Sequence, residues 1–409
     1  MNTLFRFVFF YPFFMALFWI AGSLIFFFRR EWRRHAAPTL ASHPSVVVLI
    51  PCRNEEGSIE RVVRVAAASR YPGLEILVID DASTDATPEV LRRLQGELSN
   101  LRVLTLERNL GKAQALNLGA LASDSEYLMC VDADALLEED AVAWMVHDLE
   151  QNPRVGAVTG NPRVLNRTTL VSRVQVGEFS AIVGMIKRTQ RLLGRVYTVS
   201  GVCSCFRRRA VHDVGYWSTD TVTEDVDVSW KLQLAYWGIL YEPRAVCWIL
   251  VPETARGLWR QRLRWARGGI EAAATHRRAA LQWTKRRMWP VFAELLVSTV
   301  WCYAVLVVVL AWLVTQLWPA LVPPALQVAT LLPGWTGSLL ALVCLLQFVT
   351  GLALDRRYEG RGLLRNLFWA IWYPALYWVI TAGTSVVALP LALDNRGGSR
   401  HVVWRSPDR

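Results

Sequence analysis

Long apolar runs at both ends of the chain enclose a stretch in which short apolar runs alternate with amphipathic ones. Residues 4–28, 291–318, 337–354 and 366–393 are almost continuously apolar, and segments of this length can cross roughly 30 Å of hydrocarbon as helices. The pattern predicts five parts: an N-terminal transmembrane anchor (1–35), a water-exposed domain (36–254), interfacial amphipathic helices (255–290), transmembrane helices (291–394) and a basic tail (395–409).

The central stretch has the alternation of a βα protein. We expect strands at residues 45–50, 74–79, 101–106, 127–131, 155–159 and 196–205, and helices at 57–69, 87–97, 111–121, 138–151 and 170–191. Strands with nearly continuous apolar character indicate a mostly parallel sheet covered on both faces. The predicted fold class is therefore α/β and Rossmann-like, and ligands of such sheets bind beyond the carboxyl ends of the strands.

Basic residues flank the apolar runs and predict the topology. Arginines follow residue 28 closely, with no small-residue cleavage site, so we expect a retained anchor followed by a cytoplasmic domain. Residues 366–393 contain Pro374 and Pro390 and allow two interpretations: one tilted span, or a broken helix that re-enters and returns the tail to the cytoplasm.

The formal net charge of +11 does not indicate nucleic-acid binding. Much of the positive charge lies beside the apolar runs, where arginine and lysine meet anionic lipid head groups. The stretch 255–287 is rich in arginine and tryptophan, as helices at a bilayer surface are. The chain is therefore expected to bind a lipid bilayer and not a nucleic acid.

Two pairs of aspartates follow predicted strands. Asp80 and Asp81 end the second strand, and Asp132 and Asp134 follow the fourth, so both pairs should meet at one sheet edge. Two carboxylates at this spacing can hold a hard cation, Mg²⁺ or Mn²⁺, that bridges phosphate oxygens; we expect Asp134 to ligate it directly and Asp132 to contact the metal or a ribose. The alternatives are a helix cap for the first pair and a solvated turn for the second.

Two further strings carry groups suited to transfer chemistry. Thr223-Glu224-Asp225 opens a helical stretch and offers a general base, for which we expect Asp225 with Glu224 beside it; the alternative is a helix-capping box. Gln261-Arg262-Leu263-Arg264-Trp265 combines a guanidinium for phosphate with an indole for stacking, although an interfacial helix would have the same composition. Lys112 is a further candidate for a phosphate or uridine contact.

These four strings, in this order and followed by membrane segments, resemble the pattern D, DxD, TED and QxxRW of the processive glycosyltransferases of family 2. The resemblance covers nearly the whole chain, and it is strongest to the bacterial synthases of β-1,6-linked poly-N-acetylglucosamine in biofilms. The segments that carry it include 155–165, 182–195, 199–210, 223–234 and 247–269. Ala82 and Ala133 stand where the family often has glycine, and one apolar segment precedes the domain where relatives often have two.

The resemblance implies a GT-A fold and UDP-N-acetylglucosamine as donor. It also implies a divalent cation, uridine contacts at Asp80 or Asp81, metal-diphosphate contacts at Asp132 and Asp134, acceptor contacts near Trp265, and Asp225 as base. The expected nucleotide-sugar site comprises Asp80, Asp81, Lys112, Asp132, Gln261, Arg264 and Trp265. The resemblance further implies a growing polysaccharide as acceptor, the bacterial inner membrane as location, a small membrane partner subunit, and in some relatives control by cyclic di-GMP.

Two other functions remain open from the sequence. The same catalytic residues would serve a synthase of hyaluronan, chitin or a cellulose-like polymer, because linkage and sugar depend on pocket shape. A transporter or an inactive membrane scaffold is the alternative from a different class, but neither needs Asp132, Asp134 and Asp225 together.

Overall fold

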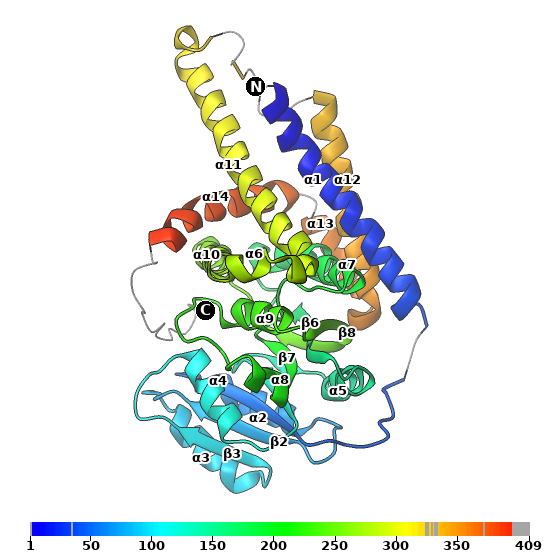
Figure 1. The fold of residues 1–409 in the computed structure, drawn as a ribbon, viewed down its shortest axis with the longest axis vertical. Coiled ribbons are helices and arrows are strands. Elements are labelled where there is room, and N and C mark those ends of the chain that lie inside the picture. The colour runs from blue at the N-terminus through cyan, green and yellow to red at the C-terminus, as the bar shows by residue number, and fades with distance from the viewer. Residues whose placement is uncertain are drawn as a thin grey trace.

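A computed structural model describes residues 2–33, 36–323, 327–328, 330, 334–370 and 373–394. A sheet with its covering helices occupies one end of the molecule, and long apolar helices extend from the other (Figure 1). The predicted tail at 395–409 lies outside the described residues.

Eight strands of the described chain form one sheet in the order β3-β2-β1-β4-β7-β6-β8-β5. Their bounds are β1 Val46–Cys52, β2 Glu75–Asp80, β3 Leu101–Thr105, β4 Tyr127–Val131, β5 Leu136–Leu137, β6 Val155–Val164, β7 Cys203–Arg207 and β8 Gly238–Ile249. Strands β3, β2, β1 and β4 are parallel, whereas β7 runs antiparallel to both its neighbours. The predicted α/β fold is confirmed.

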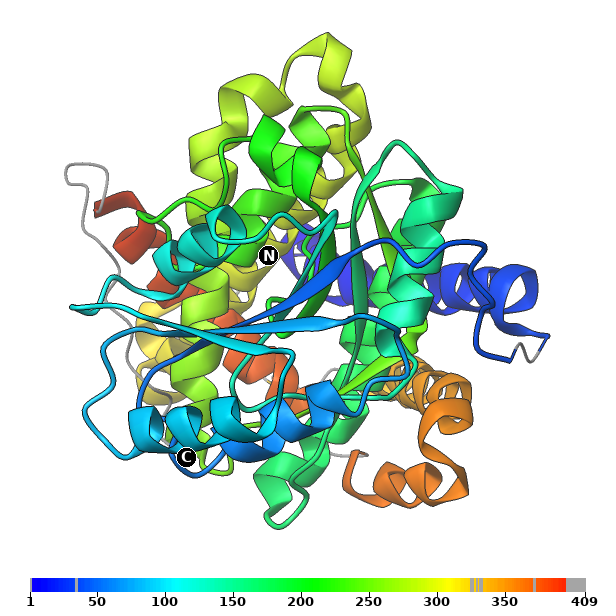
Figure 2. The same cartoon turned by 90° about the horizontal axis from the view of Figure 1, so that it is seen from below.

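Both faces of the sheet are covered, which explains the continuous apolar strands. Alternate residues of β1 enter two different cores: Val46, Val48 and Ile50 face one, and Val47 and Leu49 face the other. Helices α2 (Ile59–Ala67), α3 (Thr87–Glu97) and α5 (Ala141–Gln151) pack into the first core, and α4 (Lys112–Leu121), α8 (Arg208–Asp213) and α9 (Glu224–Leu234) into the second (Figure 2).

Some expected elements differ from the observed ones. The strand expected at 196–205 is wrong over most of its length, because residues 196–202 are irregular and β7 begins only at Cys203. The backbone there is held by side chains and not by a sheet ladder: Val196 and Val199 donate their N–H groups to Gln233 and Ser229 of α9. The helix expected at 170–191 is α6 (Leu170–Glu178) and α7 (Met185–Leu193) joined by a π-helical turn at Phe179–Gly184. Strands β5 and β8 were not predicted.

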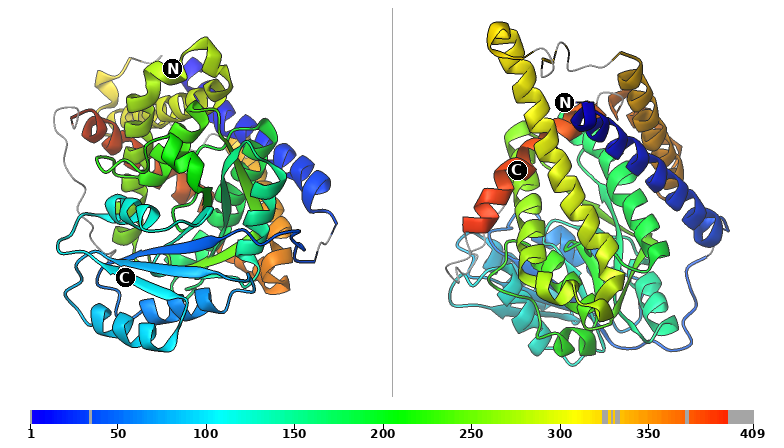
Figure 3. Two further views of the ribbon diagram at one scale, coloured as in Figure 1. Left: turned by 60° about the horizontal axis from the view of Figure 1, so that its bottom comes forward. Right: turned by 45° about the horizontal axis from the view of Figure 1, so that its top comes forward.

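Four helical segments of the described chain have the length and apolarity to cross a membrane: Thr3–Glu31, Trp283–Leu317, Gly337–Glu359 and Tyr377–Asp394. They correspond to α1 (Asn2–Phe26), α11 (Trp289–Leu317), α12 (Gly334–Glu359) and α14 (Tyr373–Asp394). Helix α12 packs beside α1 (Figure 1 and Figure 3, right). The four apolar runs of the sequence therefore do form long helices.

The last apolar run does not follow the direction of the other three. A four-residue helix, α13 (Leu367–Ala370), precedes α14, and residues 371–372 between them lie outside the described part of the chain. Helix α14 crosses the molecule between the sheet domain and the steep helices, and packs along α10 (Ala255–Ala280) (Figure 1). Because residues 371–372 are not described, the choice between one tilted span and a broken helix stays a prediction.

A buried ion network joins the apolar helices to the sheet domain. Arg188 of α7 binds Glu31 at 2.8 Å and Asp355 of α12 at 2.7 Å. Arg163 of β6 binds Asp355 at 2.5 Å and also Glu359. All five side chains are at most 2% exposed. Because each buried charge has an opposite partner, the network fixes α12 and the π-helical turn Phe27–Glu31 after α1 against α7 and β6.

Candidate functional site

The loops after β1 and β2 are joined by hydrogen bonds at the carboxyl edge of the sheet. Arg53 donates to the carbonyl oxygens of Asp81 and Ala82, the latter at 2.7 Å. The side-chain oxygen of Asn54 accepts from the N–H of Thr84 at 2.8 Å. Asn54 and Ala82 adopt positive φ angles of 54° and 56°, a conformation that costs energy for residues with a side chain.

The two adjacent aspartates have different surroundings. Asp81 is fully buried, and its carboxylate accepts the N–H groups of Leu110 at 2.7 Å and Gly111 at 2.9 Å, just before α4. Asp80 accepts only from Ser83 N–H, at 3.0 Å, and its Oδ2 is buried with no hydrogen-bond partner in the described structure. Neither caps α3, so the capping alternative fails there. Of the two, Asp80 is therefore the one whose carboxylate keeps an oxygen without a hydrogen bond.

Lys112 links two of the predicted acidic strings. Its Nζ lies 2.6 Å from Oδ1 of Asp132 and 3.0 Å from Oε1 of Glu224. Burial alone would lower the pKa of Lys112, but the charges of Asp132 and Glu224 raise it above its ordinary value. The lysine therefore stays cationic between the two carboxylates. From the sequence alone, Lys112 is expected only to contact a phosphate or uridine.

Asp225 is the most perturbed carboxylate of this group. Its Oδ2 accepts from Gly201 N–H at 3.2 Å and its Oδ1 from Val226 N–H at 2.9 Å. Burial and the nearby charge of Glu224 raise the pKa of Asp225 to about 6, from an ordinary 3.8. Burial would also raise the pKa of Glu224, but the Lys112 ammonium lowers it. One carboxylate is thus held ionised and its neighbour is poised near neutrality, as in pairs that divide acid and base roles.

The capping alternative for the TED string is not what the structure shows. Thr223 precedes α9, but its hydroxyl makes no capping hydrogen bond and is buried with no partner among the described residues. Both acidic side chains sit in the first turn of α9, where the partial positive charge of the helix end favours anions.

Lys187 is a residue of this region that sequence reasoning missed. Its side chain is 5% exposed, and its Nζ lies 2.7 Å from the Ser200 hydroxyl and 3.2 Å from that of Thr159. Burial lowers the pKa of Lys187 to about 8, against the opposing effect of Asp225. Ser200 precedes Gly201, whose N–H binds Asp225, so Lys187 helps to fix the backbone that contacts Asp225. A lysine inside an otherwise helical, part-apolar stretch was the only sequence signal.

Helix α10 brings the fourth string to the site. A glycine pair lets it approach closely: a Cβ on Gly268 would lie 2.0 Å from the Thr223 hydroxyl, and one on Gly269 would lie 2.1 Å from the Tyr197 hydroxyl. His276 of the same helix lies 2.7 Å from Asp227 of α9. The histidines were assigned no role from the sequence, but this one joins α10 to the helix that carries Asp225.

The side chains of the QxxRW string make different kinds of contact. Arg264 is near enough for its charge to lower the pKa of Asp225. Gln261 accepts from Arg262 at 2.9 Å, and Arg262 binds Glu178 at 2.7 Å. The Arg262 guanidinium also lies 4.2 Å from the Trp265 ring centre, which fixes the orientation of that 37% exposed indole. Arg262 is thus a structural residue that the motif pattern does not specify.

The carboxylates at this edge suit a divalent cation shared with a ligand. Asp132 and Asp134 follow β4, and both are partly exposed. No group of three or more potential metal-ligating side chains occurs among the described residues. A cation held here by two carboxylates would need further oxygen ligands, as when Mg²⁺ bridges protein carboxylates and phosphates.

The arrangement is that of GT-A glycosyltransferases. A mannosyltransferase of Pyrobaculum calidifontis, solved in complex with GDP-Man and Mn²⁺, superimposes with a TM-score of 0.60 and 21% identity, over 92% of this chain and 96% of that one. This likeness shows the GT-A fold expected from the sequence.

Sequence relatives define the family. The model described as "Glycosyltransferase like family 2" matches residues 43–268. A poly-beta-1,6-N-acetyl-D-glucosamine synthase of Staphylococcus epidermidis is 38% identical over 99% of this chain and 98% of its own length. A protein of the same name from Staphylococcus aureus is also 38% identical, over the same shares. The chain belongs to glycosyltransferase family 2 and is a glycosyltransferase.

Proposed function

We propose that this protein polymerises N-acetylglucosamine from UDP-N-acetylglucosamine into β-1,6-linked poly-N-acetylglucosamine, a biofilm polysaccharide. The observation that carries the proposal is the cluster of Lys112, Asp132, Glu224 and Asp225. It is supported by near-full-length similarity to synthases named for that product.

The proposed chemistry is an inverting transfer with one base. An α-linked donor and a β-linked product require direct attack by an acceptor hydroxyl, which must lose its proton. Asp225 would accept it: its pKa of about 6 leaves the carboxylate ionised at neutral pH yet more basic than an ordinary aspartate. Gly201 would fix the position of the Asp225 carboxylate through its N–H. Glu224 would stay ionised beside it without taking the proton.

The departing diphosphate would be bound at the other side of the cluster. Asp132 and Asp134 are the residues that would hold a divalent cation, Mg²⁺ or Mn²⁺, which when bound neutralises developing phosphate charge. Lys112 and Arg264 add cationic groups. When the nucleotide enters, Lys112 would exchange part of its contact with Asp132 for phosphate oxygens, because one ammonium has three donors.

Each of the remaining predicted contacts with the substrates is proposed from a different structural observation. Asp80, with an unpartnered buried Oδ2, is the proposed uridine ligand, and Asp81 is the residue that fixes the loop before α4. Trp265 is proposed to stack on an acceptor sugar because its ring is exposed and held from behind by Arg262. Gln261 would then orient Arg262 as well as contact the substrate.

The helices support a membrane setting for the reaction. We propose a multi-pass protein of the bacterial inner membrane with its sheet domain in the cytoplasm, which extends the chain processively and feeds it into the bilayer. The basic flanks of the apolar runs support this orientation. A pore of four described helices would be narrow, so a small membrane partner subunit is proposed, with control by cyclic di-GMP at that interface.

The experiment that tests the proposal is synthesis by membranes carrying the chain, with UDP-N-acetylglucosamine and Mg²⁺, followed by a β-1,6-specific hexosaminidase. We expect digestible polymer from the wild type and none from Asp225→Asn, which keeps shape but not basicity. Asp213→Asn, at the end of α8, is the matched control. Polymer that resists this enzyme would indicate that the product is hyaluronan, chitin or a cellulose-like chain instead. Full synthesis by Asp225→Asn would refute the assignment of the base.

A further inference from the structure

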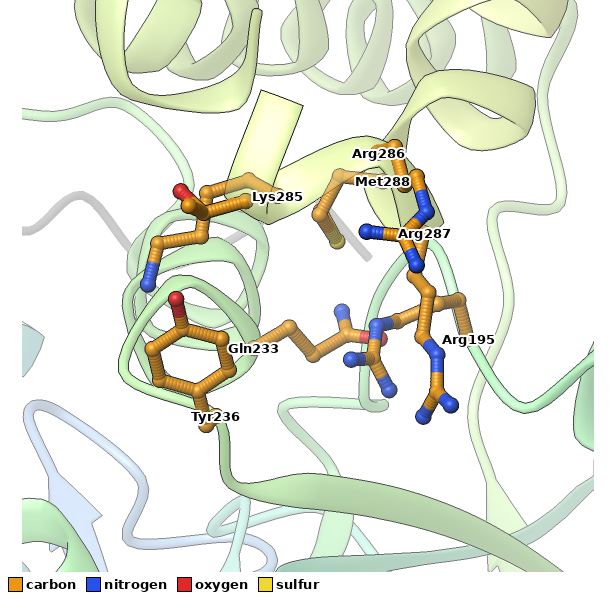
Figure 4. A pocket seen from close by; sticks show the side chains of 8 residues that line it. Arg195, Gln233, Tyr236, Lys285, Arg286, Arg287 and Met288 are labelled. Carbon is orange, nitrogen blue, oxygen red and sulfur yellow. The ribbon is translucent and has the colours of Figure 1, made fainter. Parts of the chain in front are cut away.

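A cavity lined by four basic side chains lies on the membrane side of the sheet domain. Arg195, Lys285, Arg286 and Arg287 line it together with Gln233, Tyr236, Thr284 and Met288, and its volume is about 240 Å³. It is formed by the turn after α7, the end of α9 and the 3₁₀ helix Trp283–Met288 that leads into α11. We call it the basic pocket. The arginines lie on one side of it, and Lys285 and Tyr236 on the other (Figure 4).

The positive charge of the basic pocket is not balanced by the protein. None of its eight lining residues is acidic, and within the described structure its four cationic side chains form no ion pair with a carboxylate. Burial and the charge of Arg287 lower the pKa of Arg195. The Nε of Arg195 is buried with no hydrogen-bond partner. Like charges held this close favour an anion between them.

The shape of the basic pocket favours a phosphate group. Two or three guanidinium groups offer forked N–H pairs that match phosphate oxygens. Lys285 is already engaged: it donates to the carbonyl oxygen of Leu234 and lies 3.2 Å from the Tyr236 ring centre, forming a fixed wall. The cavity is smaller than the roughly 300–1,000 Å³ of pockets that enclose a drug-sized ligand, so it suits a head group more than a whole nucleotide.

The position of the basic pocket indicates where the phosphate comes from. Trp283 is 70% exposed and its ring lies 5.4 Å from that of Trp289, the first residue of α11. Exposed tryptophans at the start of a spanning helix mark the head-group level of a bilayer. Residues 285–287 lie two to four positions after Trp283 in the same short helix, so we place the pocket at the depth of the lipid phosphates.

We propose that the basic pocket binds the phosphate of an anionic phospholipid head group and thereby anchors α9 and α11 to the bilayer surface. The proposal concerns a site separate from the carboxylate cluster, and it does not rest on the polymer made. The same phosphate chemistry could be supplied by free phosphate, and the experiment distinguishes the two sources.

The test is lipid retention by the full-length protein in detergent, measured by native mass spectrometry with added phosphatidylglycerol or phosphatidylcholine. The variant is Arg195→Gln with Arg287→Gln. The matched control is Arg29→Gln with Arg30→Gln, which removes two exposed charges beside another apolar helix. The pocket variant loses two cationic contacts to one bound phosphate, and at roughly fivefold for each we expect phosphatidylglycerol binding about 30-fold weaker. Arg29 and Arg30 do not line the basic pocket and share no bound phosphate, so the control should bind within about threefold of wild type.

Each outcome decides the proposal. Selective loss of phosphatidylglycerol in the pocket variant supports it. Equal retention by all three proteins overturns it, as does an equal loss in the control, which would indicate general attraction to anionic lipid. Millimolar inorganic phosphate is also added to the wild-type protein with bound phosphatidylglycerol. If it displaces the bound lipid as effectively as added phosphatidylglycerol does, the ligand of the pocket is a soluble anion and the proposal of a lipid is overturned. If the double variant does not fold, Arg287→Gln alone, with its exposed side chain, gives the same comparison.

Discussion

The pKa of Asp225 makes the proposed base testable through the charge of its neighbour. The surroundings of Asp225 raise its pKa to about 6, from an ordinary 3.8. Burial is the larger cause and the negative charge of Glu224 is the second. Since only the ionised carboxylate accepts a proton, kcat/KM should fall tenfold per pH unit below about 6.

Glu224→Gln removes one of those two causes and leaves the burial in place. Its loss also releases the Lys112 ammonium from one carboxylate, at present 3.0 Å away, so that the lysine can stabilise the ionised form of Asp225 more strongly. Both changes lower the pKa of Asp225. We expect the acidic limb of the profile to move down by about one unit, which corresponds to about 1.4 kcal/mol.

The assay is initial rate of polymer synthesis at limiting UDP-N-acetylglucosamine over a series of pH values. The free-enzyme limb is read from kcat/KM, so a weaker maximal rate in Glu224→Gln does not obscure its position. Glu89→Gln, an exposed residue of α3, is the control and should leave the limb in place. A limb that stays at about 6 or rises in Glu224→Gln refutes the electrostatic coupling, and a wild-type profile flat through pH 6 refutes Asp225 as the base.

Three further predictions follow from individual contacts. Lys187→Met removes a cation that interacts with Asp225 and should move the same limb upward, opposite to Glu224→Gln; a downward shift contradicts it. Gly268→Ala places a methyl group 2.0 Å from the Thr223 hydroxyl and should reduce synthesis at least about tenfold without loss of folding, whereas Gly96→Ala, with open space around it, should not. Arg188→Met leaves Glu31 and Asp355 buried without that partner and should lower the unfolding free energy by about 3–5 kcal/mol in detergent. The loss is measured as a reduced Tm. Breaking the more exposed pair Arg102–Glu75 by Arg102→Met is the control and should cost less than about 1 kcal/mol.

Local chemistry was sufficient for much of this protein. Strands β1 to β4 and the helices between them were predicted within a few residues, because continuous β-branched runs are typical of parallel strands that are buried on both faces. The placement of Asp80 and Asp132 at one edge follows from the same rule, since parallel strands end on the same side. The apolar runs identified the long helices because hydrocarbon admits few alternatives.

Contacts between distant residues were decided only by the tertiary structure. Residues 196–202 have a strand-like composition, yet Gln233 and Ser229 of α9 hold them as an irregular segment beside Asp225. The difference between Asp80 and Asp81 depends on the amides of Leu110 and Gly111, about thirty positions away. Lys187 gains its place by burial against Ser200, which no local pattern encodes.

The sequence by itself determined the α/β fold, the edge at which the acidic strings meet and the apolar helices, because these depend on periodicity and on residue order. The tertiary structure decided which carboxylate has its pKa lowered, which has its pKa raised, and how α10 and the buried ion network join the site to the apolar helices. The physical reason is that pKa values and ion pairs depend on burial and on charges a few ångströms away, and those neighbours come from segments far apart in the chain.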